Sequence, residues 1–401
     1  MQSEIFPHSR KDKTMKENYT ELLEAELSRF DKMLDGKALV RWAAGLYDKK
    51  SGGFYYSNSA RDNEQFKPDI ESTAQIITLL SSLGLFKYND GDERFPSWFK
   101  DGLINYFRAR QDKETGFFFD TQYGKGVNES KKGRNLGQST ARLKELGSSP
   151  LYPTPNERLF FDSEKKKEVL PEHYSSLEKF KAWLDAFEWN DDDGHKQYFA
   201  ANMLASSSES IKAAGFLEFT RDYITSIQNK ETGLWGKRCD SMAMNAAMKI
   251  SFLYDSEYKY PNVERMIASI GKIVESEEPY SVSTLWNPLV LVRNVIRWYG
   301  EIPKELEEKI IECKLPLIKT CIDRIERFKK PDGGFSYYPD KSSPTSQGVV
   351  VSLGLAESDA NGTLLSTASM RDTMRIIVGG SNKPLLSEYN SLFFDLIGKE
   401  K

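Results

Sequence analysis

The sequence predicts an all-α protein whose helices form hairpins that close into a ring. Three observations support this: a short turn phrase recurs along the chain, helical patterns precede its later copies, and a polar helix start follows most copies. A hairpin with one apolar face per helix cannot bury that face alone, so repeated hairpins must stack on one another. About six hairpins of roughly 40–60 residues each would fill the chain. The expected fold is an α/α toroid, (α/α)6-barrel-like, with residues 1–401 as one domain.

The turn phrase places an acidic or amide residue shortly before a glycine and an aromatic or leucine residue. Its four copies occupy residues 48–54, 111–118, 228–235 and 330–335. An Asp or Asn followed at close range by Gly ends a helix and reverses the chain, because both residue types tolerate turn conformations.

Apolar residues at helical spacing precede the last three copies and predict the outer helices. In residues 98–110, Phe99, Leu103 and Phe107 share one face. The same spacing predicts helices over residues 211–227 and 306–328.

A second helix follows most turns after a polar segment that is suited to an N-cap. The predicted inner helices cover residues 74–83, 136–146, 192–205, 242–253, 284–299 and 362–377. In a ring, the N-termini of these helices point to one mouth, where their free N–H groups and partial positive charge attract polar side chains. Strand signals are confined to short extended pieces at residues 54–57 and 117–120.

Composition and charge exclude several functional classes. The chain is 39% hydrophobic and 29% charged, as in ordinary globular proteins, and its net charge of −3 offers nothing to a nucleic acid. Its three cysteines match neither a disulfide framework nor a zinc site, so we expect no metal and no other cofactor. No signal-peptide pattern or membrane-spanning stretch is found, which predicts a cytoplasmic protein without a membrane partner. Residues 1–13 are polar and are expected to be a loose tail.

Two copies of the turn phrase carry a family resemblance. Gln228, Gly233 and Trp235 in one copy, and Gln111 and Gly116 in another, resemble the QW repeat of squalene cyclases and protein prenyltransferase β subunits. The resemblance implies an α/α toroid in which the glutamine and the aromatic residue brace neighbouring helices. Similar turn phrases occur in (α/α)-barrel polysaccharide lyases and glycoside hydrolases.

The reactions of the cyclases and prenyltransferases are not implied by these residues. Class II cyclases protonate an alkene with the middle Asp of an Asp-x-Asp-Asp motif, and the nearest segment here, residues 190–194, lacks that spacing. Protein prenyltransferases need a zinc site of Asp, Cys and His, but no histidine follows Cys239 and Asp240. An isoprenoid-handling cyclase or transferase is therefore the alternative prediction.

The polar mouth favours a carbohydrate-active enzyme, because aromatic faces pack on sugar rings while polar groups bond the hydroxyls. A glycoside hydrolase needs one protonated and one ionised carboxyl, for which we select Glu71 with Asp359 or Asp192. A polysaccharide lyase needs a base, such as His195 or a tyrosine, and an Arg or Asn that neutralises a uronate. The residues expected to bind the oligosaccharide or other small-molecule substrate are Arg61, Asp62, Asp69, Arg134, Trp189, Asp193, Asp240, Trp286, Tyr338 and Asn361.

A structural role is the alternative for most of these residues. Acids at helix starts stabilise the helix by about 0.3–1 kcal/mol without any catalysis, and residues 191–193 fit a solvated turn equally well. The long polar loop over residues 337–348 favours a function, because loops of this length in compact domains often carry one. A non-catalytic toroid that binds a glycan or a protein is the third hypothesis.

Overall fold

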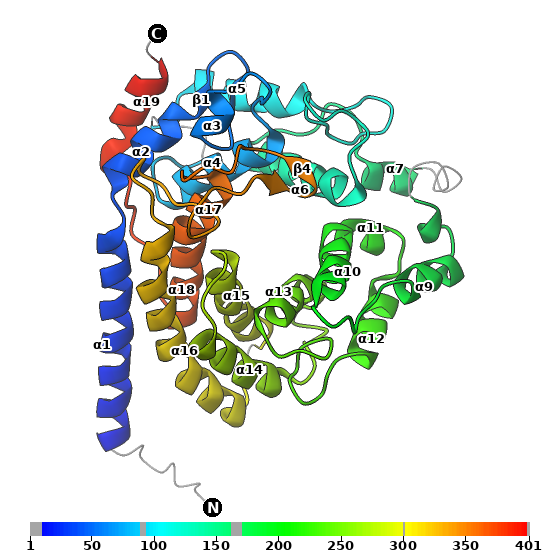
Figure 1. Cartoon of the computed structure of the whole chain (residues 1–401), viewed down its shortest axis with the longest axis vertical. Helices are drawn as coiled ribbons and strands as arrows, with labels where there is room; N and C mark the ends of the chain where they lie inside the picture. The colour runs from blue at the N-terminus through cyan, green and yellow to red at the C-terminus, as the bar shows by residue number, and fades with distance from the viewer. Residues whose placement is uncertain (1–9, 89–93, 162–170, 300, 399–401) are drawn as a thin grey trace, which may run out of the picture.

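Six inner helical segments form a closed ring. A computed structural model describes residues 10–88, 94–161, 171–299 and 301–398. Each inner helix packs against the next, and α17 packs back against α4, which closes the ring and confirms the predicted α/α toroid (Figure 1). The inner helices are α4 (Ile70–Ser82), α6 (Glu129–Glu145), α10 (His195–Ser206), α13 (Ser241–Ile250), α15 (Ser283–Trp298), and α17 (Ala360–Leu364) continued by the π-helical turn η4 (Leu365–Ser369) and α18 (Met370–Val378).

An outer helix precedes each inner one in the chain, so the ring consists of six hairpins, as predicted. The outer helices are α2 (Gly36–Gly45), α5 (Ser97–Arg108), α9 (Leu177–Asp185), α12 (Leu217–Ser226), α14 (Val263–Ser276) and α16 (Lys304–Ile325). The shorter elements are α3 (Asn58–Arg61), α7 (Pro155–Phe161), α11 (Ser208–Ala213) and the 3₁₀ turns η1 (Glu172–Tyr174), η2 (Ser251–Leu253), η3 (Glu326–Phe328) and η5 (Ser387–Tyr389). Two antiparallel pairs complete the elements: β1 (Tyr47–Asp48) with β2 (Gly53–Phe54), and β3 (Thr345–Ser346) with β4 (Val349–Val350).

Among the described residues, the helices α1 and α19 lie outside the hairpins and were not predicted. Helix α1 (Arg10–Met33) packs along α16 and α18, and α19 (Asn390–Gly398) packs on α2 (Figure 1). Residues 10–13 of the predicted loose tail belong to α1. Residues 1–9 of that predicted tail lie outside the described residues.

Helix boundaries differ from the predicted ones where a cap or a glycine was misjudged. The predicted helix 211–227 is two helices, α11 and α12, because Gly215 between them adopts a left-handed φ of +79°. Helices α4 and α6 begin earlier than predicted, directly after Asp69 and Asn128. Both side chains accept a hydrogen bond from the backbone N–H three residues on and act as N-caps.

The turn phrase repeats one geometry in the second and fourth hairpins. Asp112 Oδ2 accepts the N–H of Thr115 at 3.0 Å, and Asn229 Oδ1 accepts the N–H of Thr232 at 3.3 Å. The glycine that follows takes a left-handed φ, +77° at Gly116 and +68° at Gly233, which L side chains rarely adopt.

The turn glycines also allow the next outer helix to approach closely. A Cβ on Gly233 would lie 2.5 Å from the Met266 backbone nitrogen in α14. In the last copy, a Cβ on Gly333 would lie 2.7 Å from the Ala38 carbonyl oxygen in α2, where the sixth hairpin meets the first. The phrase therefore reverses the chain and also fixes the contact between successive hairpins.

The glutamine and the tryptophan of the phrase brace these turns, as the family resemblance implies. The Gln228 side-chain amide donates to the carbonyls of Gly233 and Pro261, each at 2.9 Å. The Trp235 indole N–H donates to the Ile224 carbonyl at 2.8 Å, and its ring meets Tyr260 edge-on at 5.2 Å. Each of these bonds satisfies a buried polar group and links the turn to neighbouring segments.

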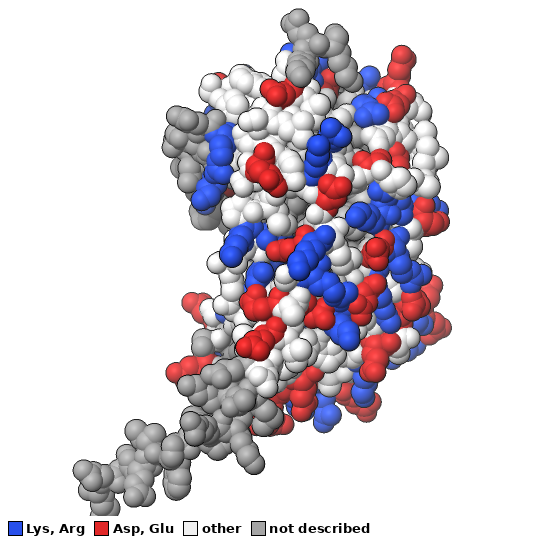
Figure 2. Space-filling view, turned by 90° about the vertical axis from the view of Figure 1, so that its left-hand side faces the viewer, with Lys and Arg blue, Asp and Glu red and all other residues white. Residues whose placement is uncertain are grey.

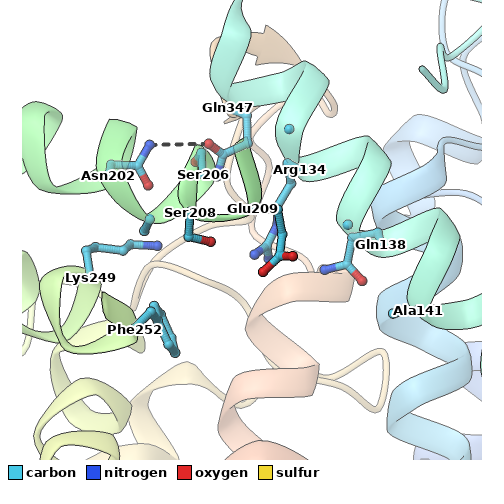
Figure 3. A pocket seen from close by; sticks show the side chains of 13 residues that line it. Arg134, Gln138, Ala141, Asn202, Ser206, Ser208, Glu209, Lys249, Phe252 and Gln347 are labelled. Atoms are coloured by element: carbon cyan, nitrogen blue, oxygen red, sulfur yellow. Dashed lines mark hydrogen bonds between the residues drawn. The ribbon is translucent and has the colours of Figure 1, made fainter. Parts of the chain in front are cut away.

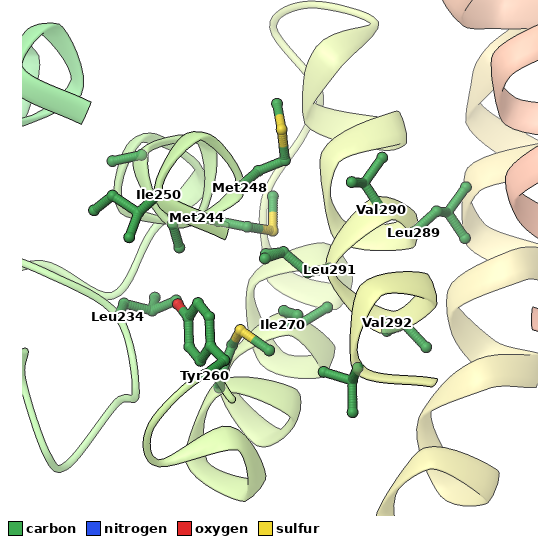
Figure 4. Packing of buried hydrophobic residues seen from close by; sticks show 14 of the residues in the cluster. Leu234, Met244, Met248, Ile250, Tyr260, Ile270, Leu289, Val290, Leu291 and Val292 are labelled. Carbon is green, nitrogen blue, oxygen red and sulfur yellow. The ribbon is translucent and has the colours of Figure 1, made fainter. Parts of the chain in front are cut away.

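Apolar side chains fill the space between the inner and outer helices. Figure 4 shows this for three neighbouring helices, where Met244 of α13, Ile270 of α14 and Leu291 of α15 interdigitate, all of them fully buried. On the face that carries α1, acidic and basic side chains are interspersed (Figure 2). No described helix combines the length and the apolar character that crossing a bilayer requires.

We expect Gly233→Ala to lower the melting temperature markedly. An alanine there is held in a disfavoured backbone region, which costs about 1–3 kcal/mol, and its Cβ also collides with α14. The matched control is Gly271→Ala in α14, where a Cβ meets nothing within 4 Å and where alanine gains up to about 1 kcal/mol of helix propensity. Equal unfolding free energies for the two variants in urea would contradict the proposed close contact.

Candidate functional site

Buried charges gather where α4 and α6 begin. Lys131 is fully buried, and its ammonium nitrogen lies 3.7 Å from Glu71 Oε2 and 3.5 Å from Asp120 Oδ2. Asp120 also accepts the N–H of Ile70 at 2.7 Å. Burying charges is costly unless they are paired, so this cluster fixes the relative position of the two helices.

Glu71 joins this cluster to an arginine that faces the centre of the ring. The Arg134 Nε atom donates to Glu71 Oε1 at 2.9 Å, and the Ser346 hydroxyl donates to Glu71 Oε2 at 2.9 Å. Burial alone would raise the pKa of Glu71, but the charges of Arg134 and Lys131 outweigh it and lower that pKa to about 2. Glu71 is therefore ionised at neutral pH and cannot act as a proton donor there.

A cavity of about 320 Å³ opens beside this pair, between α6, α10 and α13. Arg134 and Gln138 reach it from α6, Asn202 from α10, and Lys249 from α13 (Figure 3). The remaining lining residues are Gly133, Gly137, Ala141, Ala205, Ser206, Ser208, Glu209, Phe252 and Gln347. Most of the side chains at this wall are small or polar.

Lys249 stands out in this cavity. In the described part of the chain, its ammonium group has no hydrogen-bond or ion-pair partner, although the side chain is half-buried. Desolvation, helped by the charge of Arg134 and opposed by that of Glu71, lowers the pKa of Lys249 to about 8. A lysine with a lowered pKa in a cavity is a candidate functional residue.

The β3–β4 hairpin closes one side of the cavity. Its tip residue Gln347 has a left-handed φ of +49°, which is uncommon for any residue but glycine. The Asn128 amide donates to the Gln347 carbonyl at 2.9 Å, and the Ser130 hydroxyl donates to Gln347 Oε1 at 2.6 Å. The hairpin is thereby anchored on α6, with the Gln347 side chain in the cavity wall (Figure 3).

Asp359, the predicted partner of Glu71 in catalysis, is enclosed. Its Oδ1 accepts the N–H of Gly362 at 2.7 Å, and its Oδ2 accepts the N–H groups of Tyr337 at 2.7 Å and Ser343 at 3.1 Å. The side chain is fully buried, and burial raises its pKa to about 6 against these donors. The structure therefore does not open this carboxyl to a substrate.

Two further predicted residues lie near Glu71. The Gln75 side chain donates to Asn361 Oδ1 at 3.1 Å and lies 3.5 Å from Glu71 Oε1, so it links the two positions. Asp69 caps α4, and burial, opposed by the charge of Lys131, raises its pKa to about 6. The structure thus brings together Glu71, Arg134, Asn361 and Asp69, and only Arg134 of these four lines the cavity.

The predicted residues at the start of α10 lie elsewhere. The Asp192 side chain is 98% exposed and pairs with Lys237 at 3.2 Å. Asp193 accepts the backbone N–H of His195 at 3.0 Å, and both residues are exposed, whereas Trp189 is buried. None of these four residues lines the cavity.

The other predicted binding residues are engaged in local contacts. Arg61 pairs with Asp62 at 2.7 Å. Asp240 caps α13 and pairs with Arg238. The Trp286 indole donates to Thr373 at 3.2 Å, and the Tyr338 ring packs edge-on against Tyr337. None of these predicted residues lines the cavity, so their roles stay predictions.

Sequence reasoning missed Lys249, Gln138 and Gln347. The signal for Lys249 was a lysine near the end of a predicted inner helix that is otherwise rich in Met and Ala. No group of three or more His, Cys, Asp or Glu side chains that could hold a metal ion occurs among the described residues.

Comparison with known proteins gives a fold-level likeness. No protein-family model matches the chain, and no curated protein matches it. The type II terpene cyclase MstE from Scytonema is 15% identical with a TM-score of 0.43, and the match covers 87% of this chain and 97% of the cyclase. A single-residue variant of that cyclase is 14% identical with the same TM-score, and the match covers 90% of this chain and 99% of the variant.

These two structures are terpene cyclases and not carbohydrate-active enzymes. At this identity and TM-score, the likeness assigns no reaction, substrate or residue role to this chain. What the helices themselves establish is an α/α toroid with a charged, polar cavity inside its ring.

Proposed function

We propose that this chain is an enzyme for a polyhydroxylated, anionic small molecule, and that a uronic-acid-containing oligosaccharide is the substrate class that fits best. The observation that carries the proposal is the Glu71–Arg134 pair. Glu71 is 3% exposed and holds Arg134 Nε, while the Arg134 side chain remains 38% exposed beside the cavity. A guanidinium fixed in this way is pre-organised to bind a carboxylate, because its planar N–H groups match the two carboxylate oxygens.

The rest of the cavity wall supports a hydroxylated ligand. Gln138, Asn202 and Gln347 present amide groups that donate and accept hydrogen bonds. Phe252, which is 47% exposed, adds an aromatic ring. A purely hydrocarbon ligand would remove these amides from water without replacing their hydrogen bonds, which is unfavourable. The ionised Glu71 also cannot start a cyclisation by protonating an alkene.

An isoprenoid diphosphate is the second candidate, since a specific feature favours it. Arg134 and Lys249 bring two cationic groups to one cavity, and a diphosphate would match their charge. This candidate is a diphosphate-dependent transferase or cyclase.

Thermal unfolding of the intact protein with three ligand panels tests the proposal: uronic-acid oligosaccharides, their neutral counterparts and isoprenoid diphosphates. We expect acidic oligosaccharides to raise the melting temperature with concentration, since a ligand at 100 times its Kd stabilises by about 2.7 kcal/mol. Arg134→Gln should remove most of that shift. Arg327→Gln is the matched control, because Arg327 pairs with Glu278 and does not line the cavity.

Two outcomes would contradict the oligosaccharide proposal. Equal shifts from neutral and acidic oligosaccharides would show that no carboxylate is recognised. A shift caused only by isoprenoid diphosphates, and lost in Arg134→Gln, would establish the second candidate instead.

A further inference from the structure

The cavity holds an amine that anion binding alone does not explain. Lys249 projects from α13 toward the same space as Arg134 from α6 (Figure 3). Arg134 is fixed by Glu71, whereas Lys249 has no hydrogen-bond or ion-pair partner among the residues that the structure describes. A single bound carboxylate needs only the guanidinium, so the amine is left available for chemistry.

We propose that Lys249 is the base of a β-elimination, and that it removes a proton from the carbon next to a substrate carboxylate held by Arg134. This inference rests on the proposed function and names its reaction. The substrate class is a uronic-acid oligosaccharide with a glycosidic oxygen on the carbon β to that carboxylate. Hydrogens on a carbon beside a carboxylate become acidic enough to remove only when the carboxylate charge is neutralised, and Arg134 would supply that neutralisation.

The step balances without any further reactant. The Lys249 nitrogen takes the proton, and the former C–H electron pair becomes a carbon–carbon double bond. The bond from the β carbon to the glycosidic oxygen breaks, and that oxygen keeps the pair. The ammonium then returns its proton to the leaving oxygen, so the free amine is restored and no water, oxidant or reductant is consumed.

The surroundings of Lys249 raise the fraction of its unprotonated form at neutral pH above that of an ordinary lysine. Arg134 from α6 repels the ammonium charge, whereas Glu71 from α4 attracts it. Burial and Arg134 together outweigh Glu71, so the pKa of Lys249 is lowered. Glu209 at the start of α11 also lines the cavity but pairs with Lys212 at 2.9 Å. Gln138, Asn202 and Gln347 are uncharged. With the pKa lowered to about 8, about one amine in ten is unprotonated at pH 7, far more than for an ordinary lysine.

The first test measures elimination directly. The intact protein is incubated with uronic-acid oligosaccharides, and the ultraviolet absorbance of the new conjugated double bond is followed with pH. We expect the rate to rise as pH approaches about 8 and Lys249→Arg to lower it by about 10²–10⁴-fold. Because arginine keeps the positive charge, the ligand-induced thermal shift should survive. Lys237→Arg, on the exposed face beside Asp192, should change neither quantity.

The second test needs no knowledge of the substrate. Pyridoxal 5′-phosphate carries an anionic group for Arg134 and an aldehyde that condenses with unprotonated amines, and borohydride makes the product permanent. We expect mass spectrometry to find Lys249 labelled before exposed lysines such as Lys237, and less labelling in Arg134→Gln. Pyridoxal without the phosphate should label Lys249 more slowly.

The outcomes separate the two proposals. If no anionic ligand stabilises the wild-type protein, the proposed function fails. If acidic oligosaccharides bind but Lys249→Arg keeps full turnover, or the product is a saturated sugar from hydrolysis, only the assignment of Lys249 is overturned. Labelling of Lys249 no faster than Lys237 would also overturn it.

Discussion

Replacing Glu71 with Gln is expected to lower the free energy of unfolding by about 3–5 kcal/mol, the usual cost of breaking a buried ion pair. The amide has almost the same shape, but it removes the negative charge beside the fully buried Lys131 and the anchor of Arg134. Asp120 remains near Lys131 and offsets part of the loss. The variant should also lose its response to anionic ligands, because Arg134 is then no longer fixed. Urea unfolding and ligand titration measure the two effects.

Glu188→Gln is the control for the loss of a carboxylate. Glu188 pairs with Lys196 at 2.7 Å, but both side chains are more than half exposed, and such pairs contribute about 1 kcal/mol or less. If Glu71→Gln were no more destabilising than Glu188→Gln, the buried charges at α4 and α6 would not stabilise the fold as inferred.

The lowered pKa of Glu71 also predicts the direction in which the stability of the protein changes with pH. Its pKa in the folded protein is lowered to about 2 from the ordinary value of 4.5. Its contribution to stability is therefore complete above about pH 4.5 and is lost as the pH falls toward 2. The wild-type protein should lose stability more steeply than Glu71→Gln across that range, and their unfolding free energies should converge at its acidic end.

The hairpin ring could be predicted because its signals are local. A cap such as Asp112 and a turn glycine such as Gly116 act within a few residues, so they can be read from the chain directly. Helix α1 was missed although Leu23, Leu27 and Phe30, all buried, follow helical spacing. It lies outside the repeats, and only its packing against α16 and α18 shows why it is ordered.

The site was predicted only in part, because a helix start shows where polar residues gather but not which side chains face the cavity. Arg134 and Glu71 were found at the start of two inner helices, where capping chemistry marks the sequence. His195 also begins an inner helix, yet it is exposed and does not line the cavity. Lys249 lies near the end of α13, and its importance depends on Arg134, 115 positions away in sequence, so it could not be recognised locally.

Asp359→Asn is the other substitution with a large expected effect, and it should disorder the segment that carries Gln347. An asparagine side chain can still cap α17 with its oxygen. Its NH₂ group would then face the N–H groups of Tyr337 and Ser343, which now donate to Asp359 Oδ2. Leaving a buried donor without an acceptor costs roughly 1–3 kcal/mol each. Limited proteolysis should cut within residues 338–358 sooner than in the wild-type protein, and ligand-induced stabilisation should weaken.

Asp240→Asn is the control that separates helix capping from the second role of Asp359, which is to accept the two N–H groups of the loop. Asp240 caps α13 in the same way, with the Ala243 N–H at 3.0 Å, but its other oxygen pairs with the half-exposed Arg238 instead of two backbone N–H groups. Because asparagine and aspartate cap helices about equally well, we expect a change of under about 1 kcal/mol there. If Asp359→Asn lowered the free energy of unfolding as little as Asp240→Asn, Asp359 would act only as a helix cap. A large loss of stability in Asp359→Asn alone would show that this buried carboxylate joins the start of an inner helix to the hairpin at the cavity. The hairpin would then be ordered by its contact with the ring.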